Sequence, residues 1–251
     1  MASILQAKGY QVLLIDADQQ GNSTDTYRAD IGTEDEPVAT LFDAVLVSGA
    51  QRVSLDDCIQ HTPIGDIVPS DKQLSLVDSI MAVNKAITTE SLKKAIKKMK
   101  SEYDFVIIDS APGNDSMLLM ALSAADNIII TTTANRYGTQ ALSDFNNKVY
   151  KYVVEELGEE PEIIGVLITL YRNTTKTNKE VRAEIETICD KMNTQLFEKP
   201  IALGADVEKA QMARMDLYRY AKNCPPSRAY YSFVDEYLDR IGAPQFKEEG
   251  E

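Results

Sequence analysis

The sequence predicts an α/β protein with a mostly parallel sheet flanked by helices. Short apolar runs that are typical of strands alternate with longer helical stretches, and this order is typical of parallel β-α-β units. Two runs, 12–15 and 105–108, are each followed directly by an aspartate. Central parallel strands deliver acidic groups in this way to the carboxyl edge of a sheet, where open α/β folds place their ligands.

The first half of the chain begins with a helical stretch and then the first apolar strand. Gly9 can cap the helix because glycine readily adopts the left-handed backbone conformation in which many helices end. Apolar side chains spaced at three and four residues predict the helices, and short apolar runs predict the strands. The elements expected here are a helix at 1–8, a strand at 12–15, a helix at 40–46, a strand at 67–69, a long helical region after a Ser/Asp turn to about residue 100, and a strand at 105–108.

The second half continues the alternation of strands and helices. The elements expected here are strands at 127–133, 165–170 and, more weakly, 195–201, and helices at 141–157, 177–194 and 229–241. The last helix offers five large apolar side chains to the core. A chain of 251 residues with 44% hydrophobic content can bury a sizeable core. We therefore expect one domain over residues 1–243 and a disordered acidic tail at 244–251.

Composition excludes several classes of protein. No apolar stretch reaches the roughly 18 residues that span a bilayer, and residues 1–9 do not resemble a secretory signal, so we expect a cytoplasmic protein without a membrane partner. Cys58, Cys189 and Cys224 lie far apart, which indicates reduced thiols. His61 is the only histidine, so a multi-histidine metal site is excluded.

The formal charge of −13 argues against a surface that binds nucleic acid everywhere. Residues 209–228 are a local exception, with one acid, Asp216, against five cations: Lys209, Arg214, Arg219, Lys222 and Arg228. We expect these five residues to carry DNA binding, or else to form a solvated helix face with local ion pairs. A second cluster of lysines at 93–100 is interpreted as the solvated face of an amphipathic helix, because Leu92, Ala95, Ile96 and Met99 recur at helical spacing.

Two acidic segments carry the predicted chemistry. Residues 12–24 read Val-Leu-Leu-Ile-Asp-Ala-Asp-Gln-Gln-Gly-Asn-Ser-Thr, a strand that ends in Asp16 and Asp18 before a Gly-containing turn. Residues 104–113 form a second such strand, which ends in Asp109 before a turn with Pro112. A strand-terminal aspartate suits magnesium because this cation prefers hard oxygen ligands and keeps part of its water shell. The pair of segments is a stronger signal than either alone.

These segments resemble the ParA/MinD family of deviant Walker ATPases, in which they are spelled V-L-L-I-D-x-D-P-Q-G-N-x-T and D-x-x-I-I-D-x-P-P. Weaker likenesses extend over nearly the whole chain, at residues 40–46, 67–70, 124–130, 137–142, 165–169 and 175–181. The resemblance implies a P-loop NTPase-like fold of the SIMIBI class. It also implies a Soj-like partition ATPase that binds ATP and Mg²⁺, forms a homodimer with ATP, binds DNA without sequence preference on the nucleoid, and responds to a centromere-binding ParB-like protein.

The resemblance also implies roles for individual residues. Asp18 would orient the attacking water, Asp109 would bind a water of the metal, and Asp16 would lie beside the magnesium and the phosphate loop. Gln20 and Pro112 would contact the nucleotide, as the matching positions of the family do. Gln19 departs from the usual proline of the family, which loosens the turn without removing a catalytic group.

The phosphate loop is the main departure from the family. No G-x-x-x-x-G-K-[ST] occurs in the sequence, and phosphates need a nest of backbone N–H groups together with a lysine. In the family, the first strand lies between the strands that correspond to 105–108 and 127–133. We therefore expect this strand to be missing, so that the strands at 105–108 and 127–133 either are separated by a gap of roughly 10 Å or pair directly with each other. We also expect weak or no ATP binding. A fragment or a start codon placed too late would explain the loss.

Other functions fit less well. A degenerate, non-hydrolysing binding module that acts through protein contacts is the main alternative. A MinD-like membrane ATPase needs a basic amphipathic terminal helix, whereas the tail here is acidic. A capsular tyrosine kinase would have tyrosines in its tail, whereas Tyr230, Tyr231 and Tyr237 precede it. A nicotinamide dehydrogenase would need a G-x-G-x-x-G, which the sequence lacks.

Overall fold

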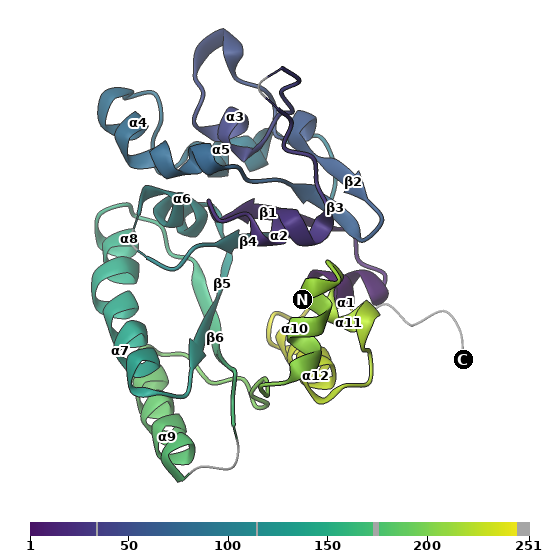
Figure 1. The fold of residues 1–251 in the computed structure, drawn as a ribbon. Helices are drawn as coiled ribbons and strands as arrows, with labels where there is room; N and C mark the ends of the chain where they lie inside the picture. The colour runs from purple at the N-terminus through teal and green to yellow at the C-terminus, as the bar shows by residue number, and fades with distance from the viewer. Residues whose placement is uncertain (34, 114, 173–175, 245–251) are drawn as a thin grey trace. The chain divides into compact units, whose positions relative to one another are not determined.

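The computed structural model describes residues 1–33, 35–113, 115–172 and 176–244 (Figure 1). The chain forms two compact units. The first unit contains residues 2–125 and 214–216, and the second unit contains Met1, 126–213 and 217–251. The predicted tail from residue 245 onward and Thr175, the first residue of the 175–181 likeness, lie outside the described residues. The expectation of a single domain over 1–243 stays a prediction.

The first unit is built on a four-stranded sheet with the order β2-β3-β1-β4. Its strands are β1 (Val12–Ala17), β2 (Gln60–Thr62), β3 (Gly65–Val68) and β4 (Phe105–Ser110). Strand β1 pairs in parallel with β3 and β4, and only the short edge strand β2 is antiparallel. The predicted strands at 12–15, 67–69 and 105–108 are therefore confirmed as parts of one mostly parallel sheet.

Strand β1 is buried on both faces, and all six of its residues are buried. Leu13 and Ile15 belong to the main core, whereas Leu14 packs with Tyr27 and Ile67 in a smaller cluster. Successive side chains of a strand point to opposite faces, so an unbroken apolar run is what a strand covered on both sides requires.

Short helices cover this sheet. They are α1 (Ala2–Ala7), α2 (Asn22–Tyr27), α3 (Leu41–Val45), α4 (Val77–Val83), α5 (Ser91–Lys98) and α6 (Ser116–Ala124), with 3-10 turns at Gly49–Gln51, Asp56–Cys58 and Lys72–Leu76. Buried residues of α3, α5 and α6 belong to the main core together with Leu13 and Ile15. Figure 1 shows α3 and α5 on the same side of β1. The expected helices at 1–8 and 40–46 are confirmed as α1 and α3.

The second unit has a two-stranded parallel sheet of β5 (Asn127–Thr133) and β6 (Glu162–Thr169). Its helices are α7 (Arg136–Asp144), a π-helical turn at Phe145–Tyr150, α8 (Lys151–Glu155), α9 (Lys176–Lys191), α10 (Ala205–Met212), α11 (Leu217–Tyr220) and α12 (Pro225–Arg240). Leu142 of α7 and Ile185 of α9 pack on Val166 and Ile168 of β6. The expected helices at 141–157, 177–194 and 229–241 are confirmed, although the first and last begin several residues earlier.

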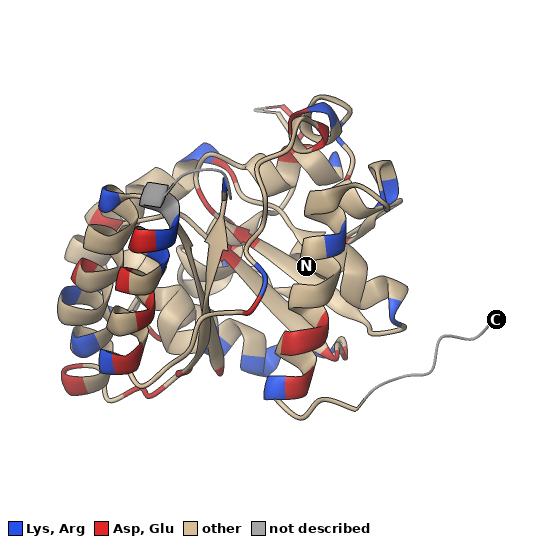
Figure 2. Cartoon of the chain, turned by 90° about the horizontal axis from the view of Figure 1, so that it is seen from below, with Lys and Arg blue, Asp and Glu red and all other residues tan. Residues whose placement is uncertain are grey.

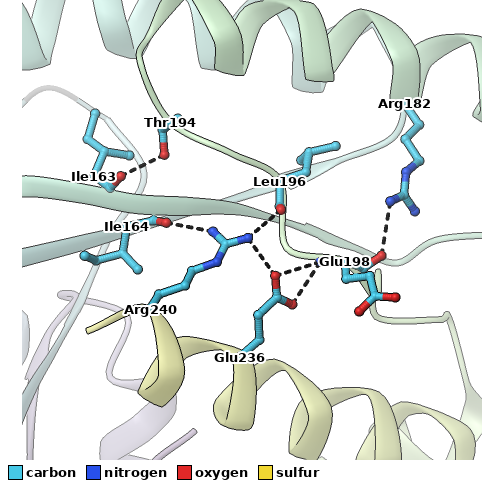
Figure 3. A network of polar contacts seen from close by, with 8 residues as sticks. All are labelled: Ile163, Ile164, Arg182, Thr194, Leu196, Glu198, Glu236 and Arg240. Carbon is cyan, nitrogen blue, oxygen red and sulfur yellow. Dashed lines mark hydrogen bonds and ion pairs between the residues drawn. The ribbon is translucent and has the colours of Figure 1, made fainter. Parts of the chain in front are cut away.

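Arg240, near the end of α12, ties this helix to β6 and to the segment that follows α9 (Figure 3). Its guanidinium donates to Ile164 O and to Leu196 O, both at 2.7 Å, and pairs with Glu236 at 2.6 Å. It also lies 4.2 Å from the centre of the Phe197 ring. A Cβ atom on Gly165 would lie too close to this guanidinium and to the Phe197 ring, so a larger residue at this position in β6 would force these side chains to shift.

Two expected elements differ from the structure. The long helical region before residue 100 is broken between α4 and α5, because Asn84 ends α4 and its side chain accepts from Ala86 N in a local turn. The weak strand at 195–201 is reduced to isolated bridges of Leu196 and Ala202 with β6 and its following loop. Pro200 has no N–H to donate, which interrupts a ladder at this point.

Both sheets keep an unpaired edge among the described residues. Strand β4 pairs only with β1, and β5 pairs only with β6. The alternative of a direct pair between the strands at 105 and 127 is therefore wrong. Phe105 to Ile108 are only partly buried, in contrast to the fully buried β1.

Candidate functional site

The predicted acidic residues lie at the carboxyl edge of the first unit's sheet. Asp16 and Asp109 are register partners on the neighbouring parallel strands β1 and β4, and Ala17 is paired with Ser110 one step further. Asp18 follows two residues after Asp16, at the same edge. The expected convergence of the three aspartates therefore rests on a direct strand pair rather than on distant loops.

Asp16 is fully buried and accepts three hydrogen bonds. Thr24 donates twice to Oδ2, from its backbone N–H and from its hydroxyl, both at 2.7 Å, and Asp18 N donates to Oδ1 at 3.2 Å. Burial raises the pKa of the Asp16 carboxyl above its ordinary value and the nearby Asp109 adds to the rise, while the bonds from Thr24 and Asp18 oppose it. Asp16 thus ties the start of α2 to the end of β1.

Asp18 and Gln20 form a tight turn after β1. Asp18 Oδ1 accepts from Gln20 N at 2.9 Å, and Gly21 N donates to Asp18 O at 2.9 Å. Gly21 has a φ of 64°, in the left-handed region that favours glycine. Within the described part of the chain, the other carboxylate oxygen of Asp18 accepts no hydrogen bond. Asp18 as a residue is partly exposed, so this oxygen is able to hold a water molecule.

Asp109 is exposed at the end of β4 and accepts one hydrogen bond, from the Ser23 hydroxyl at 2.6 Å. Pro112 is exposed in the turn between β4 and α6. Asp109 is therefore the more available of the two strand-terminal carboxylates, since the three donors to Asp16 occupy lone pairs that a metal or its waters would need.

The carboxylates at this edge of the sheet can bind magnesium only if waters or phosphates complete its coordination shell. Among the described residues, no group of three or more His, Cys, Asp or Glu side chains is arranged to hold a metal ion. Magnesium usually takes one or two carboxylates and completes its shell with waters and substrate phosphates. Asp109, with Asp16 behind it, meets that requirement, and its open oxygen is the atom that would contact the ion or its water.

A small cavity lies beside this edge. It has a volume of about 150 Å³, and its polar lining includes Gln19, Ser75, Asp78 and Asp115. Asp78 accepts from Ser116 N and Asp115 from Leu118 N, so both carboxylates cap the start of α6. Sites for drug-sized ligands usually enclose about 300 to 1,000 Å³. This cavity is too small and too acidic to hold a nucleotide by itself.

Sequence reasoning missed three hydroxyl residues that organise the edge: Ser23, Thr24 and Ser70. Ser70 donates from its hydroxyl to Asp18 O at 2.7 Å, and its N–H donates to the Thr24 hydroxyl at 2.9 Å. Ser23 and Thr24 stand at the end of the Gly-Asn-Ser-Thr string, which was a usable signal because hydroxyl residues at a helix start commonly bind nearby polar groups. Ser70 carries no comparable signal, since only the pairing of β1 with β3 brings it close.

The five cations of 209–228 lie mostly at the surface, and several already have partners. Lys209 lies 3.6 Å from Asp206, Arg214 lies 2.9 Å from Asp25, and Lys222 lies 5.1 Å from the Tyr218 ring. Arg219 is on α11 and Arg228 is on α12. Both expectations for this stretch, DNA binding and local ion pairing, are compatible with these positions.

Acidic and basic residues are interspersed on the helices at the left of Figure 2, which include α7 and α9. These helices therefore do not present a surface of a single charge sign. Separately, none of the helices in the described part of the chain combines the length and apolar character needed to cross a membrane.

Residues 1–160 match the AAA_31 family, described as an AAA domain. The chain is 29% identical over 182 residues to the sporulation initiation inhibitor protein Soj of Bacillus subtilis (strain 168), covering 71% of this chain and 68% of Soj. It is 24% identical over 243 residues to the chromosome partitioning protein ParA of Caulobacter vibrioides (strain NA1000 / CB15N), covering 96% and 87% of the two chains.

A similar fold occurs in the ATP complex of a McdA variant from Cyanothece, with a TM-score of 0.80, 19% identity, and coverage of 98% of this chain and 92% of that one. The mostly parallel sheet flanked by helices and the strand-terminal aspartates agree with this likeness. The family match covers well over half of the chain. The chain therefore belongs to the AAA_31 family and has the fold of the ParA/MinD-type P-loop ATPases.

Proposed function

We propose that this chain is the ATPase domain of a ParA-type partition protein. The observation that carries the proposal is the direct pairing of Asp16 with Asp109 at the carboxyl edge of β1 and β4, beside the Asp18 turn. In α/β folds this edge is where nucleotides bind. The names of two relatives, Soj and the partitioning protein ParA, support the choice of partition among the activities of the fold.

In this proposal each acidic residue has a separate task. Asp109 would hold Mg²⁺ or one of its waters, and the ion would supply charge neutralisation to the phosphates. Asp18 uses its open oxygen to orient the attacking water. Asp16 fixes the turn by way of Thr24, so that Asp18 and Gln20 keep their positions. Gln20 and Pro112 line the nucleotide.

The phosphates need a further element, and the unpaired edge of β4 is the proposed place for it. Val106 to Ile108 are apolar but only partly buried, and strand β4 pairs with β1 alone among the strands that the structure describes. Apolar sheet edges in stable proteins are normally paired or covered. A parallel strand on β4 that ends in a K-G-G-x-G-K-[ST] loop would deliver backbone N–H groups and a lysine beside Asp109.

The partners in this proposal follow from the same family. With ATP the protein forms a homodimer, binds DNA without sequence preference through Lys209, Arg214, Arg219, Lys222 and Arg228, and responds to a centromere-binding ParB-like protein. It acts in the cytoplasm on the nucleoid. The competing function is a binding module that has lost hydrolysis and acts through protein contacts.

The test compares the chain of 251 residues with a fusion that places a strand and a K-G-G-x-G-K-[ST] loop before Met1. Calorimetry is expected to show weak or no ATP binding by the unfused chain and clear binding by the fusion, with slow hydrolysis that requires Mg²⁺. Submicromolar ATP affinity of the unfused chain would contradict the need for the loop. A folded fusion that does not bind ATP would favour the binding module.

Two variants of the fusion separate the roles of the acids. Asp18→Ala is expected to retain ATP binding while losing turnover, because it removes the group that orients water. Asp35→Ala, an exposed acid outside the site, is the matched control and is expected to leave both unchanged. Equal turnover in the two variants would remove Asp18 from its proposed role.

A further inference from the structure

Two neighbouring hydroxyl residues at the start of α2 bind the two paired aspartates. Ser23 donates from its hydroxyl to Asp109 Oδ2 at 2.6 Å, and Thr24 donates twice to Asp16 Oδ2, both times at 2.7 Å. Asp16 and Asp109 are register partners on β1 and β4, so one short segment of α2 contacts both strands. In the family spelling Q-G-N-x-T, Ser23 stands at the open position x, and the resemblance therefore implies no role for it.

Thr24 fixes the place of Ser23 in the structure. Thr24 is buried, is held by its two bonds to Asp16, and accepts a hydrogen bond from Ser70 N at 2.9 Å. None of these bonds involves the Ser23 hydroxyl. The backbone of Ser23 is therefore anchored through the next residue, which distinguishes its contact with Asp109 from a loose contact between two surface side chains.

The Ser23 bond determines which oxygen of Asp109 remains available. The last torsion of an aspartate is broad and two-fold, so an exposed carboxylate turns readily unless a donor holds it. The length of 2.6 Å lies in the short range of hydrogen bonds from a hydroxyl to a charged oxygen. Within the part of the chain that the structure describes, Oδ1 of Asp109 accepts no hydrogen bond. Ser23 thus holds Oδ2 and leaves Oδ1 free.

The charge at this edge of the sheet favours a cation beside Oδ1. Burial raises the pKa of the Asp16 carboxyl above its ordinary value, and the charge of Asp109 raises it further, so the two carboxylates repel each other. The Ser23 hydroxyl orients Asp109 but carries no charge that would offset this repulsion. Magnesium takes one or two carboxylates and completes its shell with waters, and hydrogen bonds to a ligating carboxylate commonly tune metal affinity.

We propose that Ser23 is a positioning residue for the metal: its hydroxyl holds Asp109 so that Oδ1 faces Mg²⁺ or one of its waters. The inference rests on the proposed function, since that function makes Asp109 the carboxylate next to the metal. Its test needs neither ATP nor a phosphate loop. Failure of this test leaves ATP binding by the loop fusion untouched, and a fusion that does not bind ATP leaves this test unaffected.

The experiment titrates the isotope-labelled chain of 251 residues with Mn²⁺, a paramagnetic ion that takes the same oxygen ligands as Mg²⁺. The readout is the broadening of the NMR signal of the Ser110 N–H, which lies next to Asp109 and so reports on ions bound there. Excess Mg²⁺ is expected to reverse the broadening, because the two ions compete for one site. Asp109→Asn is expected to abolish it.

Three variants of α2 then test the role of the hydroxyl. Ser23→Ala is expected to raise the Mn²⁺ concentration needed for half of the broadening about tenfold, because the carboxylate is no longer held. Ser23→Thr keeps the hydroxyl and is expected to change that concentration by less than about twofold. Thr26→Ala is the matched control, since it removes a hydroxyl of the same helix that bonds only to Asn22 O, and it is expected to have no effect.

Several results would overturn the proposal. One is the absence of broadening at Ser110 in the unchanged chain at up to about 10 mM Mn²⁺, and another is broadening that persists in Asp109→Asn. Equal or tighter binding by Ser23→Ala would mean that the hydroxyl does not orient the carboxylate or competes with the ion. Equal losses in Ser23→Ala and Thr26→Ala, or in Ser23→Ala and Ser23→Thr, would also contradict it.

The same spectra check the fold of Ser23→Ala. The N–H signals of Thr24 and Ser70 are expected to keep their positions, because the bonds of these groups to Asp16 and to the Thr24 hydroxyl do not involve Ser23. Displacement of both signals would make Ser23 a structural residue of α2, and this result would overturn the proposal as well.

Discussion

Thr24→Val tests whether the hydroxyl of Thr24 holds the site together. Valine keeps the shape of threonine but removes a buried hydroxyl that donates to Asp16 at 2.7 Å and accepts from Ser70 N at 2.9 Å. A hydrogen bond to a charged group contributes about 1.5 to 3 kcal/mol, and an unsatisfied buried N–H costs about 1 to 3 kcal/mol. Because the two effects share one group and do not simply add, we expect a loss of about 3 kcal/mol.

The loss is expected to depend on pH through Asp16. The pKa of this carboxyl is raised above its ordinary value of 3.8, so the folded protein holds the proton more tightly than the unfolded chain does. The cost of its burial is therefore present at neutral pH and is relieved as the pH falls through the raised pKa toward 3.8. Removing a donor raises the pKa further, so the destabilisation is expected to be larger at about pH 7 than near about pH 4.

Thermal unfolding followed by circular dichroism measures the effect. For a chain of this size, about 3 kcal/mol corresponds to a decrease in Tm of about 6 to 12 °C. Hydrogen exchange of peptides that contain Ser70 gives a local readout, because the Ser70 N–H loses its acceptor. Thr26→Val is the matched control in α2, since its hydroxyl makes only an exposed bond to Asn22 O. Equal effects of the two variants, or equal losses at the acidic and the neutral pH, would refute the reasoning.

Two further predictions concern the rest of the chain. Arg240→Met is expected to destabilise the second unit by about 3 kcal/mol in urea unfolding, because it leaves Ile164 O and Leu196 O without their donor and Glu236 without its cation. The control Lys151→Met, at an exposed ion pair, is expected to change the free energy of unfolding by under about 0.5 kcal/mol. Similar losses in both variants would argue against a stabilising role of the Arg240 contacts. Burial raises the pKa of Cys58 to about 12 and of Cys189 to about 11, so few of these thiols are ionised at about pH 8. Brief treatment with iodoacetamide at that pH is therefore expected to modify the partly exposed Cys224 alone, and mass spectrometry that finds early labelling of Cys58 would contradict the burial argument.

The fold class was predictable because it depends on local patterns. The apolar runs of β1 and β4 are unbroken, which is typical of parallel strands, and each is followed by an aspartate at its carboxyl end. The predicted bounds of helices and strands were wrong where a single residue interrupts an otherwise regular pattern. Asn84 divides a helical region by bonding to its own backbone neighbours, and Pro200 interrupts a segment that otherwise follows β6.

The sequence by itself determined the acidic character of the site, because Asp16, Asp18 and Asp109 each follow an apolar run and parallel strands end at a common edge. Only the tertiary structure decided how these acids differ. Asp16 is buried and held by three donors, whereas Asp109 is exposed and bound by one hydroxyl. The difference arises because β1 lies between β3 and β4, whereas β4 is at the edge of the sheet among the described strands, and the order of strands in a sheet leaves no periodic signal in a sequence.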